Sequence, residues 1–184
     1  RINIVLNAIL DPGAPYNCLH TVGIAKKFNI YAKVQPLNQH PVFDENNRAR
    51  ISCESISPGQ LKGVISILRQ EKRVINSAVF LDNIYNFFFD KDNLALKGER
   101  CSFGYHHIEI SEDGRAYPCL EALLWKNGFK ITKGLKEIIF SQEYKQLLKD
   151  LKACPACLRN YYICYYEPRL AFSFKQNLSF GQKL

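Results

Sequence analysis

Three cysteines lie close together near the carboxyl end of the sequence. Cys154 and Cys157 form a C-x2-C pair in the stretch CPACLRNYYIC, and Cys164 follows after six residues. Two sulfurs at the C-x2-C spacing can reach one metal from a single turn, although the same spacing also suits a redox dithiol. The stretch therefore indicates thiolate chemistry and leaves both kinds of site open.

A second pair of cysteines, Cys101 and Cys119, brackets a predicted hairpin. Seventeen residues separate them, and Asp113-Gly114 between them is typical of a hairpin turn. Because a hairpin brings its two ends together, we expect four thiolates from two segments to converge. Zinc ribbons usually use two short C-x2-C pairs, so the wide pair favours an iron–sulfur cluster over zinc on spacing alone.

The composition indicates a reducing compartment, and we expect a cytoplasmic protein. The chain of 184 residues has seven cysteines, an odd number, and no secretory cleavage site in its first residues. Cys18 and Cys53 stand apart from the others and are predicted to fill core. The formal charge of +8 is spread along the chain, which is typical of solvated surface. The chain starts without Met and contains none, so we expect a piece of a longer protein.

The first half of the chain is predicted to be α/β. A strand over residues 1–10, a helix opened by Asn17 and a strand over 29–37 make a βαβ unit, which normally belongs to a parallel sheet. Ser57 before Pro58 predicts the cap of a further helix, and the apolar stretch from residue 76 predicts another. No apolar run is long enough for a transmembrane helix.

A charged segment near residue 91 marks an expected domain boundary. Beyond it lie the hairpin and a helix that Ser141 is expected to cap. That helix carries an apolar stripe and leads directly into Cys154. The predicted hairpin and helix therefore position the two groups of cysteines.

These motifs, in this order, resemble the auxiliary-cluster region of radical S-adenosylmethionine enzymes. Cys101, then DGRAYPC ending at Cys119, then C-x2-C-x6-C followed by YYE is similar to the SPASM domain and its shorter relative, the twitch domain. Residues 1–90 resemble, less specifically, the last βα units of that superfamily's partial TIM barrel. The resemblance implies an α/β fold: C-terminal βα units of a partial TIM barrel over 1–90, then a small α+β twitch/SPASM-like domain with a hairpin and helix over 91–184.

The resemblance also implies a cofactor and a set of ligands. A full SPASM pattern ends C-x2-C-x5-C-x3-C, with a further cysteine downstream, and binds two clusters. Here Pro168 stands where the next cysteine would fall and no cysteine follows, so a twitch-like site with one auxiliary [4Fe-4S] cluster is the better match. The expected ligands are Cys101, Cys119, Cys154, Cys157 and Cys164, the last as a spare or as a replacement for one of the others.

The implied function is support of substrate binding or electron transfer in the radical modification of a peptide, lipid or small metabolite. The C-x3-C-x2-C motif of the catalytic cluster is absent, so the resemblance implies S-adenosylmethionine binding only together with a missing N-terminal half. Asn7 and Gln35, expected at the ends of the two parallel strands, would then touch that cofactor or else cap the strands. A flavodoxin or ferredoxin would be a suitable electron donor.

A zinc-ribbon-like module that binds nucleic acid is the alternative. In it, the positive charge would attract phosphates and the tyrosines that follow the C-x2-C pair would stack on bases. These tyrosines are Tyr161, Tyr162, Tyr165 and Tyr166. A third interpretation is a structural domain that its metal merely holds folded.

Overall fold

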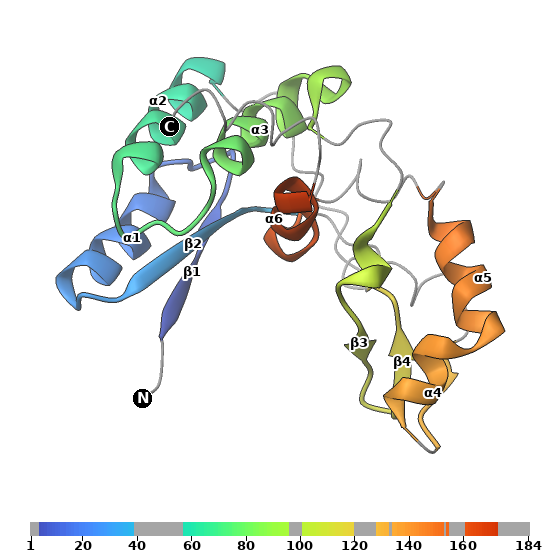
Figure 1. The fold of residues 1–184 in the computed structure, drawn as a ribbon. Helices are drawn as coiled ribbons and strands as arrows, with labels where there is room; N and C mark the ends of the chain where they lie inside the picture. Colours follow the sequence, from blue (N-terminus) through green and yellow to red (C-terminus); the bar gives the residue numbers. More distant parts are fainter. Residues whose placement is uncertain are drawn as a thin grey trace. The chain divides into compact units, whose positions relative to one another are not determined.

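The computed structural model describes residues 4–38, 57–95, 101–119, 128–132, 134–152, 154 and 161–172. It is a mixed α/β structure with small sheets and helices (Figure 1). The chain divides into two compact units, the first formed by residues 1–97 with 157–184 and the second by residues 98–156. The boundary expected near residue 91 lies close to this division. The chain from Cys157 onward, however, groups with the first unit, so the division falls between the two cysteines of the C-x2-C pair.

The first unit begins with the predicted βαβ motif. Strands β1 (Val5–Leu10) and β2 (Tyr31–Pro36) pair in parallel, and α1 (Asn17–Lys27) connects them. Alternate residues, such as Ala8 on β1 and Val34 on β2, are fully buried on the sheet face that α1 covers. The parallel βαβ prediction is confirmed.

The segment that contains Val74 lies parallel to β2 and extends the sheet beyond it. Val74 forms a parallel bridge with Ala32. The side chain of Asn76 then binds both backbone groups of Val34, accepting from its N–H at 2.7 Å and donating to its carbonyl at 2.9 Å. The amide of Asn76 thus satisfies the edge of β2 as a further strand would.

Helices α2 (Pro58–Gln70) and α3 (Ala78–Phe89) follow where the sequence predicts two helices, and α2 begins at Pro58 as predicted. Ser57 accepts from the backbone N–H of Gln60, and Ser77 accepts from that of Phe80 at 3.1 Å. The cap of α1 differs, because the helix already includes Asn17 and no side chain caps it. The prediction of Asn17 as a cap is therefore wrong. A 3-10 turn, η3 (Lys91–Asn93), comes after α3.

Tyr161 anchors the last described helix, α6 (Ile163–Phe172), to α3. Its ring is fully buried and stacks on Phe80 with 4.6 Å between ring centroids, and its hydroxyl donates to the Phe80 carbonyl at 3.0 Å. Tyr166 packs against the same ring and is buried too. Two of the four tyrosines proposed to stack on bases are therefore core residues, which corrects that part of the nucleic-acid interpretation.

A carboxylate from α6 joins the same anchor. Glu167 accepts a hydrogen bond from the backbone N–H of Ser77 at 2.8 Å. Burial raises the pKa of the Glu167 carboxyl, although this hydrogen bond opposes the shift. Asn38 adds a bond to the backbone of Tyr161. The chain after the C-x2-C pair is thus tied to the first unit by polar as well as aromatic contacts.

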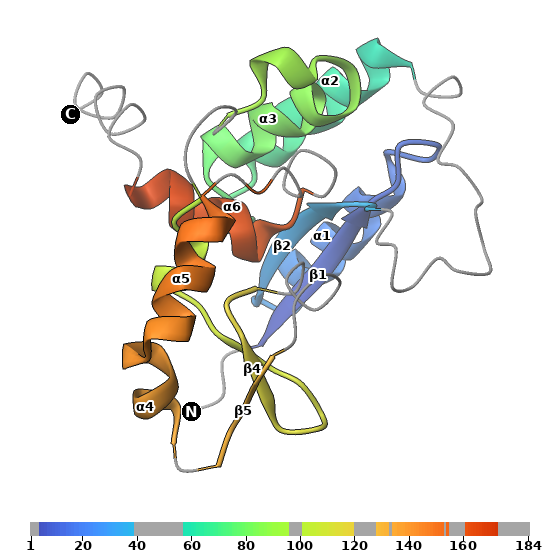
Figure 2. The same ribbon diagram turned by 90° about the vertical axis from the view of Figure 1, so that its right-hand side faces the viewer.

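The second unit is a small antiparallel sheet with two helices. The strands, in the order of their pairing, are β3 (Glu109–Ile110), β4 (Arg115–Tyr117) and β5 (Phe129–Lys130). Helix α4 (Leu135–Phe140) leads into α5 (Gln142–Leu151), as Figure 2 shows. Ser141 caps α5 as predicted by accepting from the backbone N–H of Tyr144.

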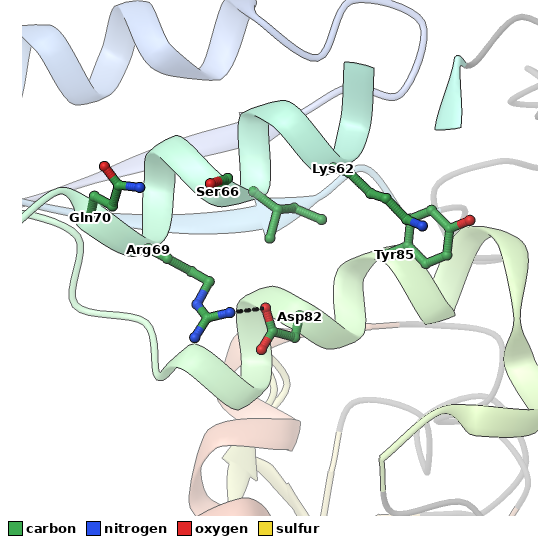
Figure 3. A pocket seen from close by; sticks show the side chains of 7 residues that line it. Lys62, Ser66, Arg69, Gln70, Asp82 and Tyr85 are labelled. Atoms are coloured by element: carbon green, nitrogen blue, oxygen red, sulfur yellow. Dashed lines mark hydrogen bonds and ion pairs between the residues drawn. The ribbon is translucent and has the colours of Figure 1, made fainter. Parts of the chain in front are cut away.

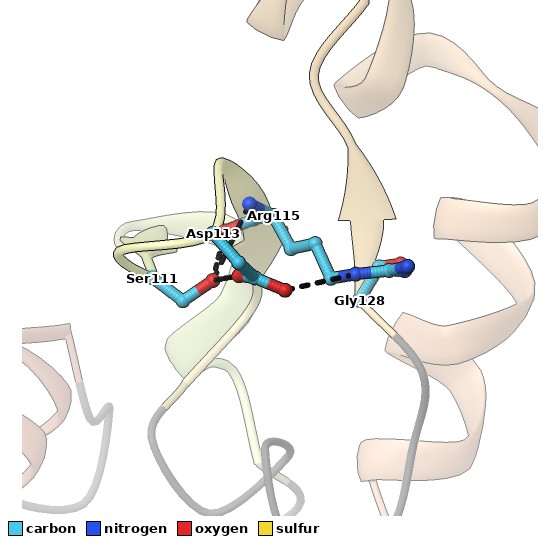
Figure 4. Close-up of polar contacts among 4 residues, drawn as sticks. All are labelled: Ser111, Asp113, Arg115 and Gly128. Carbon is cyan, nitrogen blue, oxygen red and sulfur yellow. Dashed lines mark hydrogen bonds and ion pairs between the residues drawn. The ribbon is translucent and has the colours of Figure 1, made fainter.

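The predicted hairpin between β3 and β4 is confirmed, with a longer turn than two residues. Gly114 has a φ of 73° and donates to the Ser111 carbonyl at 3.0 Å, so the chain turns over Ser111 to Gly114. The Arg115 guanidinium holds the Asp113 carboxylate at 3.1 Å and donates to the Gly128 carbonyl at 2.9 Å, as Figure 4 shows. One side chain thereby ties the turn to β5.

None of the helices in the described part of the chain is both long and apolar enough to cross a membrane.

Cys18 behaves as the core cysteine that the sequence predicts. It is 1% exposed in the first turn of α1, and its thiol donates to the Pro15 carbonyl at 3.1 Å. Burial raises the pKa of the Cys18 thiol from 9.0 to about 11. At neutral pH this thiol stays protonated, which makes it a poor nucleophile.

We predict that Cys18 resists alkylation in the folded protein. At pH 8 the raised pKa lowers its thiolate fraction about a hundredfold, and burial further excludes the reagent. Iodoacetamide labelling followed by peptide mass mapping should show slow modification of Cys18 and faster modification of the exposed Cys164. Both should react at similar rates in denaturant. Equal rates in the folded protein would contradict the burial of Cys18.

Candidate cysteine cluster site

Three of the expected ligands lie at the ends of elements in the second unit. Cys101 precedes the 3-10 turn η4 (Phe103–Tyr105), and Cys119 follows β4. Cys154 follows α5, and its backbone N–H donates to the Leu151 carbonyl at 3.0 Å. Cys119 is buried, whereas Cys101 and Cys154 are partly exposed.

The three segments that lead to these cysteines meet at a single contact point, Gly104. A Cβ atom placed on Gly104 would lie 2.4 Å from Leu148 Cδ2 and 2.8 Å from Pro118 Cβ, which shows how closely η4, the end of β4 and α5 approach. Leu151 Cδ1 lies 3.6 Å from the same position. Gly104, Pro118 and Leu151 are each within three residues of a cysteine, so each cysteine is about 10 Å of chain or less from its contact residue.

Tyr144 of α5 supports this contact point from beneath. Its hydroxyl donates to the Gly104 carbonyl at 3.1 Å, and its ring meets Phe129 edge-on at 5.6 Å between centroids. Burial raises the pKa of the Tyr144 hydroxyl, and the negative charge of the nearby Cys119 thiolate adds to the effect.

A second glycine, Gly128, lets the ring of Tyr117 pack closely against the backbone of this unit. A Cβ on Gly128 would lie 2.3 Å from the ring of Tyr117, which packs over it. Sequence reasoning missed both Gly104 and Gly128. Glycine itself was the available signal, but a sequence does not show which backbone segments approach each other closely.

The donors of this site fit an iron–sulfur cluster better than a hard cation. Thiolates are soft ligands that select iron–sulfur clusters or zinc, and none of the five described cysteines forms a disulfide. Cys157, the fourth expected ligand, lies outside the described residues, as does Cys53. Within the ranges that the structure describes, no group of three or more His, Cys, Asp and Glu side chains is arranged to hold a metal ion.

Cys164 is separated from the other three described ligands by the division of the chain. It lies on α6 in the first unit with an exposed side chain, whereas Cys101, Cys119 and Cys154 belong to the second unit. Three of the five expected ligands thus belong to the second unit, and among the described residues their side chains are not arranged to hold a metal ion.

The expected cofactor-binding residues share one face of the first sheet. Asn7 pairs with Lys33 and Gln35 with Ile9, on the face opposite to the one that α1 covers. Asn7 is the third residue of β1 and not its end, so the prediction of its position was wrong. The strand continues to Leu10 because the apolar residues that pack under α1 extend that far.

Two pockets lie outside the predicted site. One, of about 430 Å³, lies in the second unit between the segment of η4 and helices α4 and α5. The other, of about 530 Å³, lies between α2 and α3 (Figure 3). In the latter, Arg69 forms an ion pair with Asp82 at 3.1 Å and the Lys62 ammonium lies over the ring of Tyr85 at 4.5 Å.

Comparison with known protein families supports iron–sulfur binding by the second unit. Residues 101–159 match the model of the SPASM family, an iron-sulfur cluster-binding domain. The matched range includes Cys101, Cys119, Cys154 and Cys157 and ends before Cys164. Searches of curated proteins and of solved structures found no significant match.

We predict that Gly104→Ala destabilises the second unit by about 1–3 kcal/mol, as overpacking usually does. The end of the Leu148 side chain can move, but the ring of Pro118 cannot yield without shifting Cys119. The free energy of unfolding, measured by chemical denaturation, and the iron bound per chain should both fall below the values of the unchanged protein. The control is Gly23→Ala, which adds the same methyl group to α1 where nothing lies within 4 Å. Unchanged stability and iron in Gly104→Ala would show that the contact does not position the cysteines.

Proposed function

We propose that this chain is the auxiliary-cluster portion of a radical S-adenosylmethionine enzyme, and that it holds one [4Fe-4S] cluster. The observation that supports the proposal is the packing of Gly104 against Pro118 and α5, which brings together three segments of the second unit that lead to Cys101, Cys119 and Cys154. Cys157 supplies the fourth thiolate from the same C-x2-C pair. The SPASM match over the same residues supports the assignment.

Different residues of the second unit would have different roles in binding such a cluster. Three segments of the second unit would present the thiolates. The contact at Gly104 would limit how far apart these segments lie. Buried Leu148 and Leu151 exclude water from one side. When bound through four thiolates, the cluster would supply electron transfer or a fixed charge beside a substrate, because no iron would keep an open position.

The first unit contributes, in this proposal, the end of a partial TIM barrel. Its parallel strand positions follow one another along the sheet in chain order, from β1 to β2 to Val74, as consecutive βα units do in a barrel. Asn7 and Gln35 would then face the interior and contact S-adenosylmethionine once an N-terminal half completes the site. The substrate would be a peptide, lipid or small metabolite, with a flavodoxin or ferredoxin as electron donor.

The zinc-ribbon alternative has less support. Its binding surface depended on a run of tyrosines, and Tyr161 and Tyr166 are buried in the anchor of α6. The SPASM match also favours iron–sulfur over zinc. We therefore retain the auxiliary-cluster function as the single proposal.

Replacement of single cysteines by alanine tests the ligand set. Each of the variants at Cys101, Cys119, Cys154 and Cys157 should lose most of the bound iron and lower the unfolding temperature, because cluster binding is coupled to folding. The matched control, Cys18→Ala, removes a buried thiol that serves only the core and should keep its iron. Iron and sulfide assays on protein purified without oxygen give the readout.

Cys164→Ala separates two versions of the proposal. Retained iron would leave Cys157 as the fourth ligand, whereas lost iron together with a neutral Cys157→Ala would put Cys164 in its place. If Cys18→Ala removed the iron while Cys119→Ala kept it, the proposed site would be wrong.

We also predict that this chain alone does not cleave S-adenosylmethionine. Reductive cleavage of the sulfonium needs an iron with an open coordination position, and four cysteine ligands leave none. After reduction with dithionite, chromatography should detect no 5′-deoxyadenosine above a protein-free control. Its release in proportion to bound iron would contradict a four-cysteine site.

A further inference from the structure

We propose that the pocket of the second unit binds a small apolar carboxylate. This pocket is lined by the segment that follows Cys101 and by helices α4 and α5, and its volume of about 430 Å³ suits a small ligand. Gly104, Tyr144 and Leu148 belong both to this pocket and to the contact point of the cysteine site. The inference does not depend on which metal the cysteines hold.

Exposed apolar side chains surround this pocket. Tyr105 is 58% exposed and Phe140 is 64% exposed, although both are large and apolar, and Ile139 beside Phe140 is exposed as well. They come from two separate elements, η4 and α4, and line the same pocket. Buried Tyr144 contributes to the lining from α5. Exposed aromatic side chains that line one hollow are typical of a binding site.

The charge of the pocket has one sign. Lys145 lines it beside Tyr144, and His106 and His107 line it from the other segment. No described lining residue is acidic, and His107 contacts Glu109, which lies outside the lining, at 2.8 Å. Lys145 makes no ion pair with any side chain that the structure describes. The pocket therefore combines an apolar body with a single full cation, which is complementary to one carboxylate on an apolar group.

The pocket of the first unit shows why charge alone is insufficient. Its Arg69 is paired with Asp82, and its Lys62 ammonium lies over the ring of Tyr85 (Figure 3). Both cations there already have partners in the protein. Lys62 therefore provides a matched lysine for control experiments.

Binding of 3-phenylpropionate to the iron-loaded chain tests the inference. Isothermal titration calorimetry should show saturable binding, several-fold weaker binding of the neutral 3-phenylpropanamide, and weaker binding still of inorganic phosphate. Lys145→Ala should weaken 3-phenylpropionate about tenfold, as expected for loss of a charge-assisted hydrogen bond, and should bring it level with the amide. Lys145→Arg should restore most of the affinity, and Lys62→Ala should leave it unchanged.

Phe140→Ala tests how much the apolar side chains of the pocket contribute to binding. It should weaken the acid and the amide alike, with unchanged iron content to show that the unit is still folded. Absence of saturable binding, equal affinity for the acid and the amide, tighter binding of phosphate, or an effect of Lys62→Ala as large as that of Lys145→Ala would each overturn the inference. Because iron is measured on every variant, failure of the pocket and failure of the cysteine site are distinguishable.

Discussion

The close packing of the Pro118, Leu148 and Leu151 side chains against Gly104 is the constraint on which the second unit depends. No side chain could stand there, because Pro118 and Leu148 occupy the space within 3 Å of its missing Cβ. The hydroxyl of Tyr144 satisfies the carbonyl of the same residue. The contact lies within three residues of Cys101, of Cys119 and, through Leu151, of Cys154. Packing therefore brings together three segments that lead to cysteines far apart in the sequence, and a cluster bound by those cysteines would reinforce the same packing.

A second set of contacts holds the chain on the other side of the C-x2-C pair. Tyr161 is buried against Phe80 and donates to its carbonyl, and Glu167 accepts from the N–H of Ser77. The segment that carries Cys157 in the sequence is thus bounded by Cys154 in the second unit and by Tyr161 in the first.

Local signals predicted most of the elements. Ser57 and Ser141 cap their helices as predicted because serine oxygens accept from orphan backbone N–H groups, and Asp113-Gly114 turns the hairpin because glycine accepts a positive φ. What the sequence could not show is close approach across long separations, such as Gly104 on α5 or the Asn76 amide on β2. The buried state of Tyr161 and Tyr166 was missed for the same reason, since an aromatic residue can face either a core or a ligand.

The central claim is that Cys101, Cys119, Cys154 and Cys157 together hold one four-iron cluster. Mössbauer spectroscopy of ⁵⁷Fe-reconstituted protein, combined with iron, sulfide and zinc analysis, tests it most directly. The account predicts about four iron and four sulfide per chain and the spectrum of a single [4Fe-4S] cluster with cysteine ligands. Stoichiometric zinc without sulfide would contradict it, as would iron sufficient for two clusters.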